Sequence, residues 1–449
     1  MKPSANKPAP SARRLAYQAL YDILEKGAYG NLTIQQALKS YDLGEAETHL
    51  FTELVYGVLR RYNRLLWVIS QLSSRPVKKL HPSVRILLCL GLYQLLYLTR
   101  IPESAAVNES VKIAKKVTHP GNAGFVNAIL RNYIRRKEEI HLFPREENRI
   151  LYDSLTWNEP EWLVSRWEKE WGEEKAGKVM EAMNRIPSLT VRMNTLKTDR
   201  EAFLGLLKEQ GIEAEPVSWK KEAFHITKGA HHIWKLLDQG YGYAQSLSSM
   251  VPADVLSPKP GERVLDMCAA PGSKTTQLAE LMNNEGSIDA WDLYPHKIGL
   301  IKNNAKKLGI TIIHAGARDS SKPFPALAGA YDRVLLDAPC SGLGVLSHKP
   351  EIRWRRGEEG LAEFPPLQEK LLQAAASYVK QGGTLVYSTC TLNREENEDR
   401  VTAFLAAHPD FHRRDFAIPN LGKSENGMIT IWPDETGSDG FFIAKLVKE

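Results

Sequence analysis

The chain has 449 residues, of which 43% are hydrophobic and 25% are charged. This length predicts two or three domains, and the composition is typical of a globular protein. The N-terminal stretch is polar, without the apolar core of a signal peptide, and the longest apolar stretch, residues 86–98, is too short to cross a bilayer. These features argue against a membrane protein, and we expect a cytoplasmic one.

The net charge of +6 is unevenly distributed along the chain. The first 140 residues contain 21 Lys plus Arg and 10 Asp plus Glu, a net charge of +11, so the rest carries −5. A basic region of this kind favours an anionic partner, and nucleic acid is the obvious candidate. A merely solubilising surface is the alternative that charge alone leaves open.

Residues 12–136 have the pattern of amphipathic helices. Leu15, Ala19 and Ile23 recur at helical spacing, and several prolines mark helix boundaries. The pattern predicts an all-helical domain over residues 1–140 with five to seven helices. The charged stretch 141–154 is expected to be a connector.

The next region, residues 141–245, is expected to form a small α+β module. It holds, in order, a helix from Glu161, an extended run over 189–196, a helix near 201–210 and short strands around Val217 and His225.

From residue 246 to 449, short apolar runs alternate with helical segments. The runs expected to be strands are 263–267, 287–291, 311–314, 333–336 and 384–387. This alternation predicts a Rossmann-like domain with a doubly wound, mostly parallel sheet, which binds ligands at the carboxyl ends of its strands.

The loop after the first of these strands reads DMCAAPGSK, from Asp266 to Lys274. Its small residues let the backbone approach a ligand, and a helix with free N–H groups follows. A phosphate-binding P-loop is excluded, because its lysine must directly follow glycine whereas Lys274 follows Ser273.

Acidic residues follow the next three strands. Asp292 and Asp337 end their strands and Asp319 follows another, where carboxylates can accept hydrogen bonds from a nucleoside cofactor. Each acid alone could equally be a solvated turn or a helix cap.

The four cysteines are Cys89, Cys268, Cys340 and Cys390, and no two have CxxC spacing. The spacing therefore suggests neither a zinc site nor a disulfide framework, and we expect no metal. A free cysteine is usually an inert buried residue, as expected for Cys89. Cys340 and Cys390 instead lie at strand ends, where a thiolate can react.

Four segments, DMCAAPGSK, LLDAPCSGLG, YSTCTLNREENE and DGFFIAKL, resemble the signature blocks of RNA cytosine-C5 methyltransferases. Residues 102–109 and 124–132 are similar to the NusB-like domain of one branch, the ribosomal RNA small-subunit methyltransferase B family. The resemblance thus covers nearly the whole chain.

The resemblance implies an S-adenosylmethionine site, with Cys390 as the attacking thiol and Cys340 as a second thiol that assists product release. The residues that it implies for the cofactor are Cys268, Ala269, Ala270, Pro271, Gly272, Ser273, Lys274, Asp292, Asp319 and Asp337. Two departures occur: Gln245 is followed by serine where the family often has aspartate, and Ala317 and Arg318 precede Asp319, so a neighbour could be the third acid.

The chemistry independently requires such residues. C5 of cytosine is a poor nucleophile, and attack of a thiolate on C6 activates it. A group near N3 must stabilise the developing charge, and protonated Asp337 is the expected donor. Chemistry alone does not decide which thiol attacks C6, since the attacking thiol of DNA cytosine methyltransferases follows a proline, as Cys340 does here. The resemblance to the RNA enzymes favours Cys390 as the attacking thiol.

Residues 348–356 mix cations with a tryptophan, which suits contact with single-stranded RNA or, alternatively, a solvated helix start. We expect a monomer that methylates C5 of a cytosine in 16S ribosomal RNA, with the target base flipped out. The alternatives are methylation of tRNA or another RNA, a DNA cytosine methyltransferase, and a non-catalytic RNA-binding or antitermination factor.

Overall fold

The computed structural model describes residues 10–449, so the polar stretch 1–9 lies outside the described residues. The chain divides into two compact units. The first contains the described residues of Met1–Asn184 together with a later segment, Leu346–Glu359, and the second contains Arg185–Val345 and Gly360–Glu449. Each unit is described by itself.

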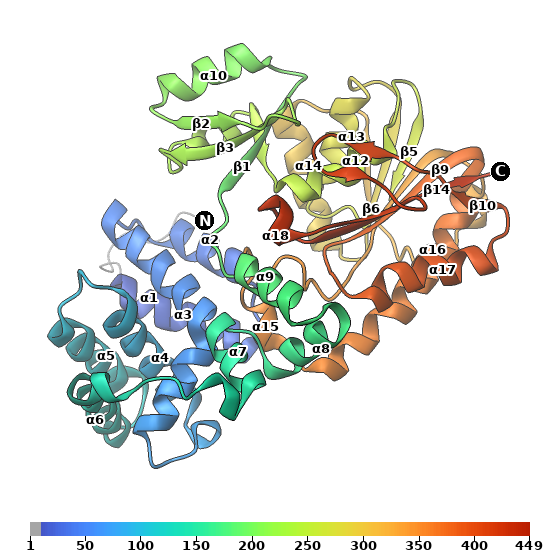
Figure 1. The fold of residues 1–449 in the computed structure, drawn as a ribbon. Coiled ribbons are helices and arrows are strands. Elements are labelled where there is room, and N and C mark those ends of the chain that lie inside the picture. The colour runs from blue at the N-terminus through green and yellow to red at the C-terminus, as the bar shows by residue number, and fades with distance from the viewer. Residues whose placement is uncertain (1–9) are drawn as a thin grey trace. The chain divides into compact units, whose positions relative to one another are not determined.

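The first unit is helical (Figure 1). Its helices are α1 (Ala12–Lys26), α2 (Gly30–Ser40), α3 (Glu45–Leu72), α4 (Pro82–Tyr97), α5 (Glu103–Val117), α6 (Pro120–Arg136), α7 (Arg149–Trp157), α8 (Glu161–Trp171), α9 (Glu173–Met183) and the short α15 (Ile352–Arg355). Six of them lie between residues 12 and 136, which confirms the all-helical prediction for this region.

Local sequence sets these helices. The stripe of Leu15, Ala19 and Ile23 is buried in the core of the unit, as an amphipathic helix requires. Helix α1 ends at Gly27, which adopts a left-handed conformation with φ of 70°. Helix α4 begins at Pro82, whose missing N–H costs nothing in the first turn.

The prediction of a connector over residues 141–154 was wrong in its second half, because helix α7 begins there. The Asn148 side chain accepts a hydrogen bond from Leu151 N and caps the helix, while Asn158 ends it with φ of 54°. Helices α7 to α9, which the sequence pattern groups with the middle module, belong to the helical unit.

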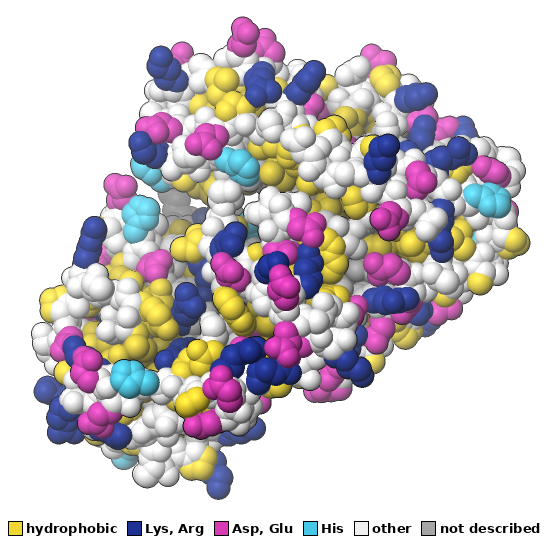
Figure 2. Space-filling view, viewed as in Figure 1, with side chains coloured by type: hydrophobic (Ala, Val, Ile, Leu, Met, Phe, Trp, Pro, Cys, Tyr) yellow, Lys and Arg dark blue, Asp and Glu magenta, His cyan; other side chains and the backbone are white. Residues whose placement is uncertain are grey.

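Helices α5 and α6 present a basic face. Figure 2 shows dark-blue Lys and Arg side chains over the part of the surface where Figure 1 labels these helices. The exposed basic residues of the two helices are Lys112, Lys115, Lys116, Arg131, Arg135 and Arg136.

The second unit contains two sheets of more than two strands. The smaller is antiparallel, in the order β2-β3-β1-β4. Its elements are β1 (Leu189–Met193), β2 (Glu213–Pro216), β3 (Ala223–Lys228), β4 (Gly242–Ala244), α10 (Arg200–Glu209) and α11 (Ile233–Asp238). This sheet and its helices are the α+β module.

The larger sheet has the order β10-β14-β9-β8-β5-β6-β7, and β13 also pairs with β14. Its strands are β5 (Arg263–Asp266), β6 (Ser287–Asp292), β7 (Ile313–Ala317), β8 (Tyr331–Asp337), β9 (Val379–Thr389), β10 (Phe411–Arg413), β13 (Met428–Ile431) and β14 (Phe441–Lys448). The five neighbours from β9 to β7 are parallel, which confirms the doubly wound, mostly parallel sheet. The antiparallel strands β10, β13 and β14 were not predicted, and β7 begins later than expected.

Helices connect and cover these strands. They are α12 (Leu247–Leu256), α13 (Ser273–Leu281), α14 (Pro295–Leu308), α16 (Phe364–Tyr378), α17 (Glu398–Ala407) and α18 (Pro433–Thr436); a minor pair, β11 (Ala417–Ile418) and β12 (Gly422–Lys423), stands apart. Within residues 10–449, no helix is both long and apolar enough to cross a membrane. The parallel strands bring Asp266, Asp292 and Asp337 to one edge of the sheet.

Candidate active site

Two thiols meet at the carboxyl ends of β8 and β9. The strands pair in parallel with Asp337 opposite Ser388, so the loops that follow them run side by side. The Sγ atoms of Cys340 and Cys390 lie 3.4 Å apart, within hydrogen-bond distance for sulfur. The hydrogen bond with Cys390, together with burial, raises the pKa of the Cys340 thiol. The sheet therefore brings together the two cysteines that the sequence singled out.

Asp337 lies beside these thiol loops and is held from two sides. Its Oδ2 accepts from Lys274 Nζ at 2.7 Å, and its Oδ1 accepts from Ser388 Oγ at 2.8 Å. Lys274 also donates to Ser249 Oγ at 3.0 Å. Both carboxyl oxygens thus act as acceptors, so a donor role for Asp337 requires a proton that this arrangement does not hold.

The loop after β5 leads directly into α13. Gly272 precedes the helix with φ of 103°, and no side chain caps the first turn. Gly272 is required there, because a Cβ at this φ would be strained and would also lie 3.3 Å from Ile301 Cα. The N–H groups of the first turn therefore face the loop without a capping side chain.

Asp266 ends β5 in a fully buried position. Burial raises the pKa of its carboxyl group to about 7, although a hydrogen bond from Thr275 opposes the shift. Its Oδ2 accepts from Thr275 Oγ1 at 2.7 Å, whereas Oδ1 has no hydrogen-bond partner within the described chain. A buried oxygen of this kind calls for a donor.

The other two predicted acids differ in their surroundings. Asp292, at the end of β6, is 7% exposed and accepts from the backbone N–H groups of Ala270 and Tyr294. Asp319 lies beyond β7, where Ser321 donates to it and Lys322 pairs with it at 3.1 Å. Hydrogen bonds from Ser321 and Lys322 lower the pKa of Asp319, which therefore behaves as a turn-forming acid.

These residues fit an S-adenosylmethionine molecule. The unpartnered oxygen of Asp266 and the uncapped turn of α13 supply an acceptor and several donors at one edge of the sheet. Asp292 is placed at the end of the next strand, where acids hold ribose hydroxyls in nucleotide-binding sheets. Cys268 within the loop is half-buried, and desolvation raises the pKa of its thiol well above the ordinary value, so it is suited to packing. Among residues 10–449, no group of three or more possible metal ligands occurs.

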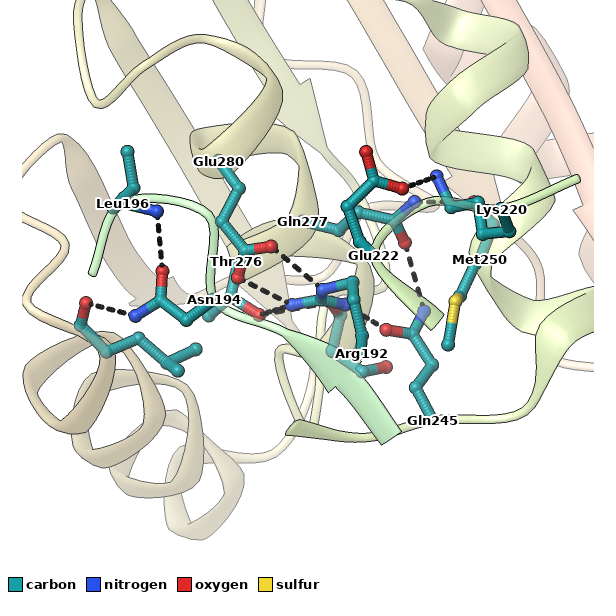
Figure 3. A network of polar contacts seen from close by, with 12 residues as sticks. Arg192, Asn194, Leu196, Lys220, Glu222, Gln245, Met250, Thr276, Gln277 and Glu280 are labelled. Carbon is teal, nitrogen blue, oxygen red and sulfur yellow. Dashed lines mark hydrogen bonds and ion pairs between the residues drawn. The ribbon is translucent and has the colours of Figure 1, made fainter. Parts of the chain in front are cut away.

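Arg192 is a residue of this region that the sequence did not reveal. It is 1% exposed on β1, and Figure 3 shows it pointing toward α13. Its Nε and Nη2 lie 3.0 Å from the two carboxyl oxygens of Glu280, and Nη2 also donates to Thr276 Oγ1 at 3.0 Å. Nη1 donates to Ser273 O at 2.9 Å and to Gln245. Arg192 thus fastens the helix that follows the cofactor-type loop; an arginine within an apolar strand was the available signal.

The expectation that residues 348–356 contact RNA was wrong for Arg353 and Trp354. Arg353 is 1% exposed and lies 2.7 Å from a Glu159 carboxyl oxygen, within the helical unit. Trp354 donates its Nε1–H to Leu59 O at 3.1 Å and packs edge-on against Tyr62. Both side chains are used inside the protein, and α15 is not a solvated helix start.

Models of three families match the chain. The 16S rRNA methyltransferase RsmB/F model matches residues 253–447, the NusB family model residues 10–135, and the RsmF/B-like ferredoxin-like domain model residues 159–231. A Rossmann-like sheet with these matches defines a methyltransferase preceded by a helical domain of the NusB family.

Relatives over the full length narrow the class. The probable ribosomal RNA small subunit methyltransferase B of Bacillus subtilis (strain 168) is 38% identical over 98% of this chain and 99% of its own length. The crystal structure of PH0851 covers 99% of this chain and 100% of its own with a TM-score of 0.82 and 28% identity. The crystal structure of NSun6 from Pyrococcus horikoshii with SFG covers 64% of this chain and 98% of its own, with a TM-score of 0.58 and 27% identity. The chain belongs to the ribosomal RNA small subunit methyltransferase B family.

Proposed function

We propose that this protein transfers a methyl group from S-adenosylmethionine to C5 of a cytosine in 16S ribosomal RNA, through a transient bond between Cys390 and C6 of the base. The observation that supports this best is the pair of thiols, 3.4 Å apart at the edge of the sheet where the cofactor-type loop begins. A reaction that needs one thiol for attack has no use for a second one unless that thiol has a task of its own.

The cysteines divide the reaction between them. Cys390 Sγ forms a bond to C6, and the electrons of the C5–C6 double bond make C5 a nucleophile. S-adenosylmethionine, when bound, supplies an electrophilic methyl group on its sulfonium. The C5 proton then leaves, the C5–C6 double bond forms again, and the bond from C6 to Cys390 breaks. Cys340, whose raised pKa keeps it a thiol, assists this release.

Asp337 is the proposed donor to N3 of the base. Because both of its oxygens accept hydrogen bonds, it needs a proton before it can donate. The cofactor would be held by the backbone and side chains from Cys268 to Lys274, together with Asp292, Asp337 and, less directly, Asp319.

We also propose a division of labour along the chain. Residues 1–140 would bind RNA, 141–245 would form a supporting module, and 246–449 would carry out the transfer. The exposed cations of α5 and α6 support RNA binding by the first part, because phosphate contacts come from such side chains. We propose a cytoplasmic monomer that needs no metal.

The thiols provide the test of the reaction. We expect Cys390→Ala to abolish methylation and the covalent adduct, and Cys340→Ala to accumulate an adduct between protein and RNA that survives a denaturing gel. Labelled S-adenosylmethionine with RNA substrate measures both. An adduct in Cys390→Ala would reverse the assignment, and absence of methylation by the unaltered protein on any RNA would reject it.

The substrate is tested separately with 16S rRNA, 23S rRNA, tRNA and plasmid DNA, followed by mapping of methylcytosine in each. Modification of tRNA without 16S rRNA would reject the substrate while the reaction stands. Charge reversal of Lys115, Lys116 and Arg135 should weaken rRNA binding and make its salt dependence shallower. The matched control reverses Lys208, Lys221 and Lys423, which are exposed in the second unit; an equal effect would remove α5 and α6 from the RNA site.

A further inference from the structure

Glu396 is a fully buried acid close to the two thiols, and the mechanism above does not use it. It ends a short 3-10 turn, Arg394–Glu396, just before α17, and it is 0% exposed. Its carboxyl oxygens accept four hydrogen bonds from neutral donors. These donors are Ser341 Oγ at 2.5 Å and Asn393 Nδ2 at 3.1 Å on Oε1, and Ser341 N at 2.9 Å and Gln368 Nε2 at 3.0 Å on Oε2.

Two of these bonds come from the loop of Cys340, and a third comes from a side chain that also binds this loop. Ser341 directly follows Cys340 and donates both its N–H and its hydroxyl to Glu396. Gln368, which donates to the same carboxyl group, also donates to Pro339 O at 3.0 Å. Ser341, on one side of Cys340, is thus held by the Glu396 carboxyl group. Pro339, on the other side, is held by Gln368, which itself donates to Glu396.

The loop of Cys390 is tied to the same acid. Thr391 directly follows Cys390, and its Oγ1 lies 2.8 Å from Ser341 Oγ. Because the Ser341 hydroxyl proton is directed to Glu396, Thr391 is the donor in this contact. Asn393, two residues further along, binds the Glu396 carboxyl group directly. A single side chain therefore receives hydrogen bonds that begin in both thiol loops.

We propose that Glu396 is a positioning residue that holds the Cys340 and Cys390 thiols at their working separation. A buried carboxyl group with several short hydrogen bonds fixes its donors more firmly than water would, because leaving any of them unpaired is costly. This inference deepens the proposed function, since two thiols with successive tasks on one base must stay close together. A role limited to starting α17 would leave the distance between the thiols unaltered.

The separation can be measured without activity. Phenylarsine oxide forms two As–S bonds with a pair of close thiols and releases one molecule of water, whereas a single thiol binds it weakly. We expect the full-length protein to bind this reagent tightly, and Cys340→Ser and Cys390→Ser to give the single-thiol baseline. Glu396→Ala should bind it at least tenfold more weakly than the unaltered protein, with a dissociation constant for S-adenosylmethionine within twofold.

Matched variants separate positioning from general loosening. Glu395→Ala removes an exposed acid from the same turn and should leave arsenical binding within twofold. Glu396→Gln keeps an oxygen for Ser341 N and Gln368 and should fall between. Thr391→Val removes the contact between the two loops and the longer bond from Asn393 N at 3.3 Å, but leaves Glu396 in place. It should give a smaller loss, so the inference can be tested even if Glu396→Ala fails to fold.

The outcomes are distinct. Unaltered arsenical binding in Glu396→Ala and Thr391→Val, or an equal loss in Glu395→Ala, would overturn the positioning role. A selective loss in the Glu396 variants supports it. If the unaltered protein methylated no cytosine while this selective loss persisted, the proposed function would fail and the positioning of the thiols would stand.

Discussion

Two buried arginine–glutamate pairs, one in each unit, differ in how completely the acid is satisfied. Arg192 faces both carboxyl oxygens of Glu280 at 3.0 Å. Arg353 faces only one oxygen of Glu159, and the other is buried without a hydrogen-bond partner in the described chain. Burial raises the pKa of both acids. Because an unpaired buried acceptor is costly, we expect the acid with two aimed donors, Glu280, to be the better stabilised of the two.

The largest effect is expected from Arg192→Met. Glu280 would lose both of its hydrogen bonds from Arg192, and removing one partner of a buried pair costs about 3–5 kcal/mol of unfolding free energy. We expect a value near the upper end, together with weaker binding of S-adenosylmethionine, because Arg192 also holds Ser273 and Thr276. Urea unfolding and calorimetry measure the two. The double variant with Glu280→Leu should recover part of the lost unfolding free energy. A loss below about 1 kcal/mol in Arg192→Met would contradict the expectation that this pair is the better stabilised of the two.

A smaller effect is expected from Arg353→Met. Glu159 would lose the cation that pairs with it, but one of its oxygens is already unpaired among the described residues, so we expect a loss of about 3 kcal/mol of unfolding free energy. Hydrogen–deuterium exchange should rise in α7 to α9 and in Leu346–Glu359, since Arg353 also donates to Met183 O. The peptides of β5 to β7 serve as the internal control. Unchanged exchange in Leu346–Glu359 would show that the pair does not hold this segment.

Asp266 extends the comparison to a buried acid without a bound cation. Burial raises its pKa from 3.8 in the unfolded chain to about 7. The folded protein thus binds the proton more tightly, so this contribution to stability is full below about pH 4 and is lost as the pH rises through about 7. Relative to the unaltered protein, Asp266→Asn should gain on the order of 2 kcal/mol between about pH 5 and pH 8. Denaturation at the two pH values measures this; a constant difference would contradict it.

The smallest effect is expected from an exposed pair. Lys137 lies 3.2 Å from Glu103, and their side chains are 46% and 49% exposed. Solvent screens such a pair, so Lys137→Met should change the unfolding free energy by less than about 0.5 kcal/mol. Thermal unfolding at low and high salt measures it. A loss as large as that of the buried pairs would show that nearness alone decides, contrary to the comparison.

The sequence predicted what depends on local pattern and on strand ends. Asp292, Asp337 and the two cysteines follow short apolar strands, and parallel strands bring such residues to one edge. Arg192 could not be assigned a partner, because Glu280 lies 88 residues away along the chain. The strand order that creates such contacts is a property of the whole sheet.

The basic segment around Arg353 was assigned to the wrong partner for the same reason, because its actual partner is distant in the sequence. Its composition is that of an RNA-binding stretch, yet its partner Glu159 lies 194 residues earlier and neutralises it inside the protein. Basic residues that bind RNA and basic residues that pair with a buried acid have the same sequence pattern. The antiparallel strands β10, β13 and β14 were missed because their register depends on pairing with β14 and β9 rather than on local alternation.

The inclusion of Leu346–Glu359 in the helical unit has a consequence for synthesis on the ribosome. The polypeptide passes between the two units three times, after Asn184, Val345 and Glu359. The helices from α1 to α9 emerge first, but the core around Glu159 is complete only after about four-fifths of the chain has been translated. Until Arg353 has been synthesised, Glu159 lacks the arginine with which it pairs. Vectorial folding therefore cannot finish the first unit before most of the second has left the exit tunnel, and a gene fragment that ends at Asn184 encodes an unfinished domain.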